Sequence, residues 1–261
     1  MDIKKAVTRR INLYKNRKNT GISLKELLAY DTILLFKREE RKKARKKLSK
    51  CYVKQRYNLE FSENSGVGEV LVDDIYSSYS DFIPKENQTV IDVGAQYGDY
   101  AILCSKVYKA KVYTFEPLPE NFKEILENIK LNGLNEQQIQ AFNVALGNKN
   151  NTARISYSGE MANNIGKGKK AEVAFKTLDS YNFKPDLMKI DVEGFELEVL
   201  EGAVETIKKY HPKIIIETHS RGLEEKTKQF LSAFNYAVKH EGRSIYNSNE
   251  KFDKVTNLFF E

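Results

Sequence analysis

The stretch Val90-Ile-Asp-Val-Gly-Ala-Gln-Tyr-Gly-Asp-Tyr-Ala101 decides the fold class of this chain. The apolar run that ends at Asp92-Val93 predicts a strand, and the apolar spacing from Ala101 to Val107 predicts a helix. Gly94 and Gly98 bracket the bend between them, where glycine lets the backbone turn tightly and approach a ligand. A strand, a glycine bend and a helix in this order are typical of nucleotide-binding α/β folds.

The remainder of the chain alternates strand and helix patterns in the same way. Further strands are predicted at residues 111–115, 139–144, 153–157, 187–190, 213–217 and 236–239. Further helices are predicted at residues 119–131, 196–210 and 223–234. Alternating strands and helices require a mostly parallel sheet that is covered on both faces. We therefore predict an α/β fold, a doubly wound Rossmann-like domain over residues 88–261.

The charge of the chain is unevenly distributed. Residues 1–56 hold 19 Lys and Arg against five Asp and Glu, a net charge of +14, whereas the remaining residues hold 24 against 31, a net charge of −7, so that the chain as a whole carries +7. We predict a basic helical extension over residues 1–56, in which Lys37–Lys50 forms an exposed helix with almost no apolar face. Such a segment suits nucleic acid, anionic lipid or an acidic partner, or remains a solvated surface.

A short module is predicted between the basic extension and the α/β domain, over residues 57–87. Tyr57–Phe61 alternates like a strand, and the residues from Val70 to Tyr79 suggest a short helix. No apolar run approaches the ~18 residues of a membrane-spanning helix, and the N-terminus lacks the apolar core of a signal peptide. These features predict a cytoplasmic protein. Cys51 and Cys104 have no metal-ligand spacing, and we expect two buried or unreactive thiols.

The turns that follow the predicted strands hold the candidate cofactor residues. Asp92 places a carboxylate beside the glycine bend, which would repel a pyrophosphate but suits a ligand with a cationic amino-acid end. The third glycine of a dinucleotide-binding loop is also absent. Glu116 follows the next strand, where an acidic residue accepts both hydroxyls of a ribose. Pro117 is placed to cover an adenine face, and Asn143 to bond an adenine edge.

Two later turns hold the candidate catalytic residues. Asp191 ends a strand, with Glu193 in the turn after it, and carboxylates at the mouth of a parallel sheet are costly to bury without a role. Glu217 and His219 end the next strand. Asp191, Glu193 or His219 would accept or orient the proton of an acceptor hydroxyl. A metal site built from Asp191, Glu217 and His219 is conceivable, but no ligand spacing supports one, so we predict no metal ion.

Four stretches together resemble one family, the FkbM-type methyltransferases: VIDVGAQYGDYA at 90–101, FEPLPENFKEILENIKLN at 115–132, TLDSYNFKPDLMKIDVEGFELEVLEGA at 177–203 and IIIETHS at 214–220. The resemblance covers roughly residues 57–245. It implies a class I fold of about seven strands, the last antiparallel, that transfers methyl from S-adenosylmethionine to hydroxyls of sugars, polyketides or lipids.

The resemblance also implies which residues contact the cofactor. They are Asp92, Gly94, Ala95 and Gly98 at the methionine part, with Tyr97 in the same loop, Glu116 at the ribose, Asn143 near the adenine and Asp191 in the methyl-transfer cleft. The family more often has Asn at the position of Gln96.

Three other functions remain open. An RNA methyltransferase would dock phosphates on residues 1–56, although no Asn-Pro-Pro-Tyr motif for methylating a base is found. A nicotinamide oxidoreductase is opposed by the missing glycine and by Asp92. A non-enzymatic scaffold would use the basic segment alone. The polar, glycine-rich loop between Gly159 and Lys170 is interpreted as an acceptor-side lid or as a mobile hairpin tip.

Overall fold

The computed structural model describes residues 38–157, 169–243 and 255–261. The chain divides into two compact units, the first ending at Asp74 and the second running from Ile75 to Glu261. The boundaries predicted after residues 56 and 87 stay predictions. The predicted lid lies outside the described residues except for its last positions, which belong to a strand.

The described part of the first unit contains two helices, α3 (Arg38–Tyr57) and α4 (Gly68–Leu71). The predicted basic helix is confirmed, but the absence of an apolar face is wrong. Ala44 and Leu48 are only 4% and 1% exposed, because their spacing of four residues puts them on one face of the helix.

The strand predicted at Tyr57–Phe61 is also wrong. Tyr57 is the last residue of α3, and Asn58 adopts a left-handed conformation with φ of 55° while its amide donates to the Lys54 carbonyl. Asparagine ends helices in this way because it tolerates that conformation. Asp74 then accepts hydrogen bonds from Arg56 and from the Tyr57 hydroxyl, both at 2.9 Å, which join the last residue of this unit to the end of α3.

The second unit is built on a mostly parallel sheet. Its seven strands within the described residues follow the order β3-β2-β1-β7-β8-β10-β9. Their bounds are β1 Thr89–Val93, β2 Lys111–Phe115, β3 Ile139–Phe142, β7 Leu187–Ile190, β8 Lys213–Thr218, β9 Val238–Arg243 and β10 Thr256–Phe260. Only β10 pairs antiparallel, with β8 on one side and β9 on the other. The predicted doubly wound fold is confirmed, as is the antiparallel last strand implied by the family resemblance.

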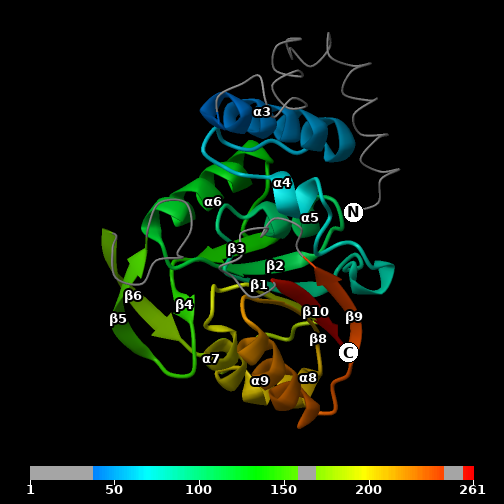
Figure 1. Ribbon diagram of the computed structural model, residues 1–261, viewed down its shortest axis with the longest axis vertical. Helices are drawn as coiled ribbons and strands as arrows, with labels where there is room; N and C mark the ends of the chain where they lie inside the picture. Colours follow the sequence, from blue (N-terminus) through cyan, green and yellow to red (C-terminus); the bar gives the residue numbers. More distant parts are fainter. Residues whose placement is uncertain (1–37, 158–168, 244–254) are drawn as a thin grey trace. The chain divides into compact units, whose positions relative to one another are not determined.

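Helices cover both faces of this sheet (Figure 1). On one side lie α5 (Asp99–Lys106) and α6 (Pro119–Leu131), and on the other lie α7 (Glu196–Glu201), α8 (Val204–Tyr210) and α9 (Arg221–Ser232). The single helix predicted at 196–210 is two helices. Gly202 ends the first of them and lies so close to the Gly147 carbonyl that a Cβ there would be 2.0 Å from the oxygen.

A smaller three-stranded sheet follows β3. It consists of β4 (Ala145–Leu146), β5 (Asn151–Tyr157) and β6 (Lys169–Lys176). Two short 3-10 helices, η1 (Ser80–Phe82) and η2 (Leu178–Tyr181), complete the described elements. One hydrophobic cluster is formed by the central strands and α7 to α9, and buried side chains of α5 and α6, such as Ile102 and Ile125, cover the other face of the sheet.

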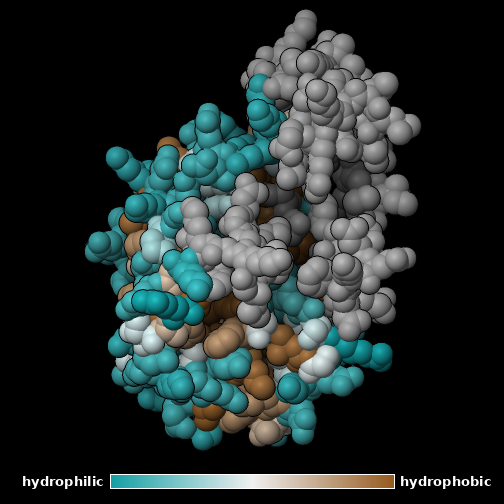
Figure 2. All heavy atoms as spheres, turned by 60° about the vertical axis from the view of Figure 1, so that its left-hand side comes forward, coloured by the Kyte–Doolittle hydropathy of each residue, from teal (hydrophilic) through white to brown (hydrophobic). Residues whose placement is uncertain are grey.

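The described surface is mainly hydrophilic in the view of Figure 2, and hydrophobic side chains gather in its lower half. That half is the level at which Figure 1 shows α7, α8 and α9. None of the described helices combines the length and the apolar character needed to cross a membrane.

Candidate functional site

The register of the parallel strands brings the predicted turns to one edge of the sheet. Val93 at the end of β1 pairs with Phe115 at the end of β2 and with Ile190 at the end of β7. Ile190 in turn pairs with Ile216 of β8. The chain turns to β2 on one side of β1 and to β7 on the other, so this edge is the switch point at which doubly wound sheets bind ligands.

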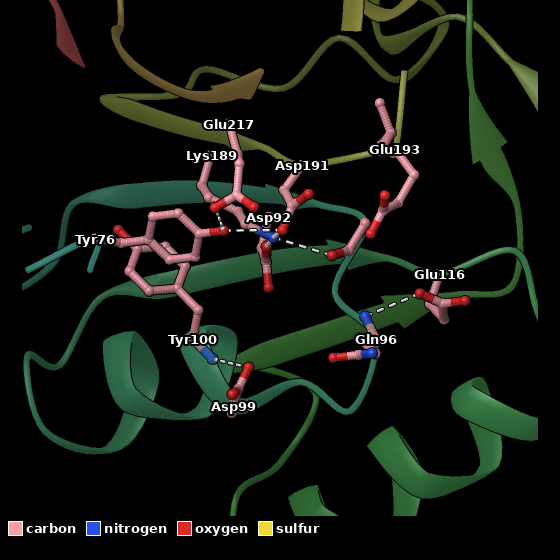
Figure 3. Close-up of polar contacts among 12 residues, drawn as sticks. Tyr76, Asp92, Gln96, Asp99, Tyr100, Glu116, Lys189, Asp191, Glu193 and Glu217 are labelled. Carbon is pink, nitrogen blue, oxygen red and sulfur yellow. Dashed lines mark hydrogen bonds and ion pairs between the residues drawn. The ribbon is translucent and has the colours of Figure 1, made fainter. Parts of the chain in front are cut away.

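The glycine bend and Glu116 are in direct contact. The amide of Gln96 donates to the Glu116 carboxylate at 2.9 Å (Figure 3). The amides of Gly94 and Ala95 both donate to the Phe115 carbonyl, at 3.0 and 3.1 Å. Gly94 and Gly98 have φ of 77° and 76°, a conformation that favours glycine. The bend after β1 and the acid after β2 therefore lie side by side at the carboxyl edge of the sheet.

Glu116 is an unusually buried carboxylate, only 5% exposed. Burial raises its pKa to about 7, although hydrogen bonds from the Leu118 amide, the Gln96 amide and the Asn121 side chain act in the opposite direction. Its Oε1 accepts from Leu118 at 3.0 Å and from Asn121 at 3.2 Å. A carboxylate held in place by these hydrogen bonds could accept hydroxyl donors from a ligand at this edge of the sheet.

Asp92 forms a buried ion pair that the sequence did not indicate. Its carboxylate is 0% exposed and lies 3.3 Å from the Lys189 ammonium, which is also buried. Burial raises the pKa of Asp92, and Lys189 acts against that rise. Lys189 also donates to the Gly94 carbonyl at 2.9 Å. Asp92 therefore shares its charge with an internal cation beside the bend, and its contact with a cofactor stays a prediction.

The other predicted cofactor residues lie around the same bend. Ala95 and Tyr97 are 3% and 8% exposed, and the Tyr97 carbonyl accepts from the Asn128 side chain at 2.9 Å. Asn143 donates to the carbonyls of Glu116 and Pro117, at 2.9 and 3.1 Å. Asn143 thus stabilises the turn after β2. The contacts of Asn143 and Pro117 with adenine stay predictions.

The candidate catalytic residues meet at the ends of β7 and β8. The Nε2 atom of His219 lies 3.9 Å from Asp191 Oδ1, 3.3 Å from Glu193 Oε2 and 3.5 Å from Glu217 Oε1. The hydroxyl of Tyr76 is 2.8 Å from Asp191 Oδ2 and 3.2 Å from Glu217 Oε2 (Figure 3). One histidine and three carboxylates thus share this corner with a buried tyrosine.

The protonation of this corner favours a carboxylate over the histidine as proton acceptor. Burial lowers the pKa of His219, but the carboxylates of Glu196, Glu193, Asp191 and Glu217 together raise it to about 9. The imidazole is therefore charged near neutral pH. Burial, followed by the charge of Asp191, raises the pKa of Glu217 well above its usual value. The sequence left Asp191, Glu193 and His219 open as the base, and their roles stay predictions.

A hollow of about 370 Å³ adjoins His219. Its lining residues are Gly194, His219, Ser220, Gly222, Leu223 and Lys226. These come from the turn after β7, the end of β8 and the first turn of α9. The hollow thus places a surface with hydroxyl and ammonium groups next to the catalytic candidates.

Sequence reasoning missed two residues of this site, Lys189 and Tyr76. Lys189 stands inside the otherwise apolar strand Leu187–Ile190 and is 3% exposed. A lysine in a strand buried on both faces needs an acidic partner, and this signal was available. Tyr76 carried no comparable signal, because it precedes β1 in a stretch without regular structure.

Comparison with known proteins gives independent evidence about the family of this chain. A model of the FkbM methyltransferase domain matches residues 92–244. Hexuronic acid methyltransferase AglP of Haloferax volcanii is 31% identical to the chain over 146 residues, which cover 52% of this chain and 58% of that protein. The match therefore spans less than two thirds of that relative.

Two solved structures share the fold. Methyltransferase FkbM from Methylobacillus flagellatus KT superposes with a TM-score of 0.52 at 17% identity, over 95% of this chain and 60% of that one. A methyltransferase from Pyrococcus furiosus gives a TM-score of 0.51 at 14% identity, over 84% of this chain and 96% of that one. At these identities the likeness concerns the fold alone.

Proposed function

Because the chain belongs to the FkbM methyltransferase family, we propose that it uses S-adenosylmethionine to methylate a hydroxyl group of a sugar or another small-molecule acceptor. The observation that carries this proposal is the contact between the bend after β1 and Glu116 after β2. We infer a ligand crevice between Gly94 and Glu116, in which the Glu116 carboxylate accepts the hydroxyls of a ribose and the tight bend holds an amino-acid end.

The bend suits an adenosyl amino acid better than a dinucleotide. A pyrophosphate-binding loop needs free backbone amides directed at the ligand. Here the amides of Gly94 and Ala95 bond Phe115, that of Gln96 bonds Glu116, and that of Gly98 bonds the Ala95 carbonyl at 2.7 Å. The carboxylate of Asp92 beside the bend is paired with Lys189, so this ion pair offers no net positive charge to a pyrophosphate. The crevice therefore fits S-adenosylmethionine, with Glu116 holding the ribose.

S-adenosylmethionine supplies, when bound, an activated methyl group whose C–S bond breaks as the acceptor oxygen forms the new C–O bond, with the electron pair left on sulfur. The protein must then orient the acceptor hydroxyl and take its proton. Asp191, Glu193 and Glu217 are the oxygen acceptors in reach of one another around His219. In the absence of a bound cation, the protonated His219 orients these carboxylates and offsets their mutual repulsion.

The hollow next to His219 favours a polar and acidic acceptor. Ser220 offers a hydroxyl there, and Lys226 is an exposed cation on the same rim. The printed name of the Haloferax volcanii relative is that of a hexuronic acid methyltransferase. We therefore propose a sugar acceptor that carries a carboxylate near the methylated hydroxyl.

A methyl-transfer assay with S-adenosylmethionine labelled in its methyl group tests this proposal. The acceptor panel holds a neutral glycoside, a glycoside of a uronic acid and an RNA transcript. We expect label on the uronic acid glycoside, in an ether that survives mild alkali. Label released by mild alkali would indicate methylation of the carboxylate instead. Label only on RNA would contradict the proposed acceptor and favour docking by residues 1–56.

A further inference from the structure

Three potential metal ligands converge on one point at the carboxyl ends of β7 and β8. The ligand atoms of Asp191, Glu217 and His219 all lie within 4.8 Å of one another. Asp191 follows β7, while Glu217 and His219 are separated by one residue at the end of β8. The spacing of these residues along the sequence predicted no metal ion, because only the folded chain brings the ends of the two strands together.

The Asp191 and Glu217 carboxylates each direct one oxygen toward His219 and the other toward Tyr76. Asp191 Oδ1 and Glu217 Oε1 face His219 Nε2, at 3.9 and 3.5 Å. Asp191 Oδ2 and Glu217 Oε2 face the Tyr76 hydroxyl, and Lys189 lies 3.8 Å from Asp191 Oδ2. One nitrogen and two oxygens are therefore directed at a common space, while the opposite oxygens are held by donors.

The distances from His219 Nε2 to the two carboxylate oxygens suit a divalent cation. Two adjacent ligands at about 2.1 Å from a metal ion lie roughly 3.0–3.4 Å apart when the angle between them is that of an octahedral or tetrahedral site. The separations of His219 Nε2 from Glu217 Oε1 and Asp191 Oδ1 exceed this range by at most about 0.5 Å, and all three ligand atoms lie within 4.8 Å of one another. Small side-chain movements would close the difference. One imidazole with two carboxylates is a donor set that suits Mn²⁺.

A second observation comes from the other ring nitrogen of His219. Metal-bound histidines direct this nitrogen to a carboxylate, which fixes the ring. His219 Nδ1 is buried without a hydrogen-bond partner among the described residues and lies 3.7 Å from Glu196 Oε1. The Glu196 side chain is 0% exposed, its Oε2 has no partner among those residues, and its Oε1 accepts from the amides of Val192 and Gly194. The fully buried Glu196 carboxylate thus lies on the Nδ1 side of the His219 ring.

We propose that Asp191, Glu217 and His219 bind a divalent cation of the Mn²⁺ type, with Glu196 and Tyr76 orienting the ligands from outside. The role of this site rests on the proposed function, since a cation here would bind the acceptor hydroxyl oxygen and make its proton easier to remove. The proton would pass to a neighbouring carboxylate such as Glu193. The same cation would also hold a carboxylate of the acceptor next to that hydroxyl.

Mn²⁺ binding to the full chain, stripped with a chelator, tests the site by electron paramagnetic resonance, in which bound Mn²⁺ loses the sharp signal of the free ion. The variants are His219→Asn and Glu217→Gln. The matched control is His240→Asn, because His240 lies 2.8 Å from Asp81 Oδ2 at another place and is the same type of residue beside one carboxylate. Circular dichroism of each variant identifies any that does not fold, and two independent variants guard against this outcome.

We expect one Mn²⁺ per wild-type chain, unchanged binding in His240→Asn, and affinity at least tenfold lower in His219→Asn and Glu217→Gln. Equal Mn²⁺ affinity of wild type and both site variants would overturn the proposal. S-adenosylhomocysteine is titrated into the same samples by calorimetry. If S-adenosylhomocysteine binds and Mn²⁺ does not, only the cation site is overturned. If Mn²⁺ binds and S-adenosylhomocysteine does not, the proposed function is contradicted.

Discussion

Replacement of Gly94 by alanine tests how closely the bend after β1 approaches the turn after β7. A Cβ on Gly94 would stand 1.8 Å from the Asp191 carbonyl oxygen, where real contacts are no shorter than 3.0 Å. The Asp191 backbone would therefore have to move by more than 1 Å. That movement would break the 3.0 Å hydrogen bond from the Asp191 amide to the Val93 carbonyl, which joins β7 to β1.

The cost of Gly94→Ala has three parts. The left-handed backbone of Gly94 costs alanine about 1–2 kcal/mol, the clash about 1–3 kcal/mol, and the lost hydrogen bond about 1 kcal/mol. Gly133→Ala is the matched control, because Gly133 has φ of 62° and its Cβ would meet nothing within 4 Å. Gly133→Ala therefore has only the cost of placing alanine in a left-handed backbone conformation.

Urea unfolding of the two variants measures the difference. We expect Gly94→Ala to lower the free energy of unfolding by at least 2 kcal/mol more than Gly133→Ala, at similar m-values. Calorimetry should show that Gly94→Ala also weakens the binding of S-adenosylhomocysteine, while Gly133→Ala does not. Equal destabilisation by the two substitutions would refute the close approach of the two turns.

Three further predictions concern single side chains. Glu116→Gln should weaken S-adenosylhomocysteine binding by about tenfold or more, because hydrogen bonds to a charged acceptor are worth about 1.5–3 kcal/mol. Burial raises the pKa of Glu116 to about 7, so its stabilising effect is complete below the unfolded value near 4.5 and is lost as the pH rises through 7. The unfolding free energy of ligand-free wild type should therefore fall across this range by up to about 3 kcal/mol more than that of Glu116→Gln. Comparing the two proteins cancels the titration of Asp99, whose pKa burial also raises to about 7. Lys189→Met should cost about 3–5 kcal/mol in urea unfolding, because it leaves Asp92 buried without its cation, and a second change, Asp92→Asn, should recover part of the loss. Asp179→Ala removes the acceptor for two backbone amides at the start of α8 and should cost about 1–2 kcal/mol without changing the affinity for S-adenosylhomocysteine.

Much of the second unit could be predicted because its signals are local. The strands at Thr89–Val93, Lys111–Phe115 and Leu187–Ile190 are short apolar runs between turn residues, and each appears at the predicted bounds. The antiparallel strand Thr256–Phe260 was missed. It is inserted between β8 and β9, and such a non-local pairing leaves little trace in the local pattern.

The candidate site was predictable to a similar degree. The rule that ligands bind at the carboxyl ends of parallel strands placed Gly94, Glu116, Asp191 and His219 at one edge, and the register brings them there. The sequence indicates that Lys189 needs an acidic partner but not that this partner is Asp92, because the two residues lie on strands that are neighbours only in the folded chain. The chain order likewise hides the convergence of Asp191 with Glu217.

A calorimetric titration of the wild-type chain with S-adenosylhomocysteine, run beside one with NAD⁺, decides whether the crevice between Gly94 and Glu116 is an adenosyl amino-acid site. Binding of one S-adenosylhomocysteine per chain, weakened by Glu116→Gln and without a signal for NAD⁺, is the result that we predict. Binding of NAD⁺ in preference, or S-adenosylhomocysteine binding that Glu116→Gln leaves unchanged, would contradict it.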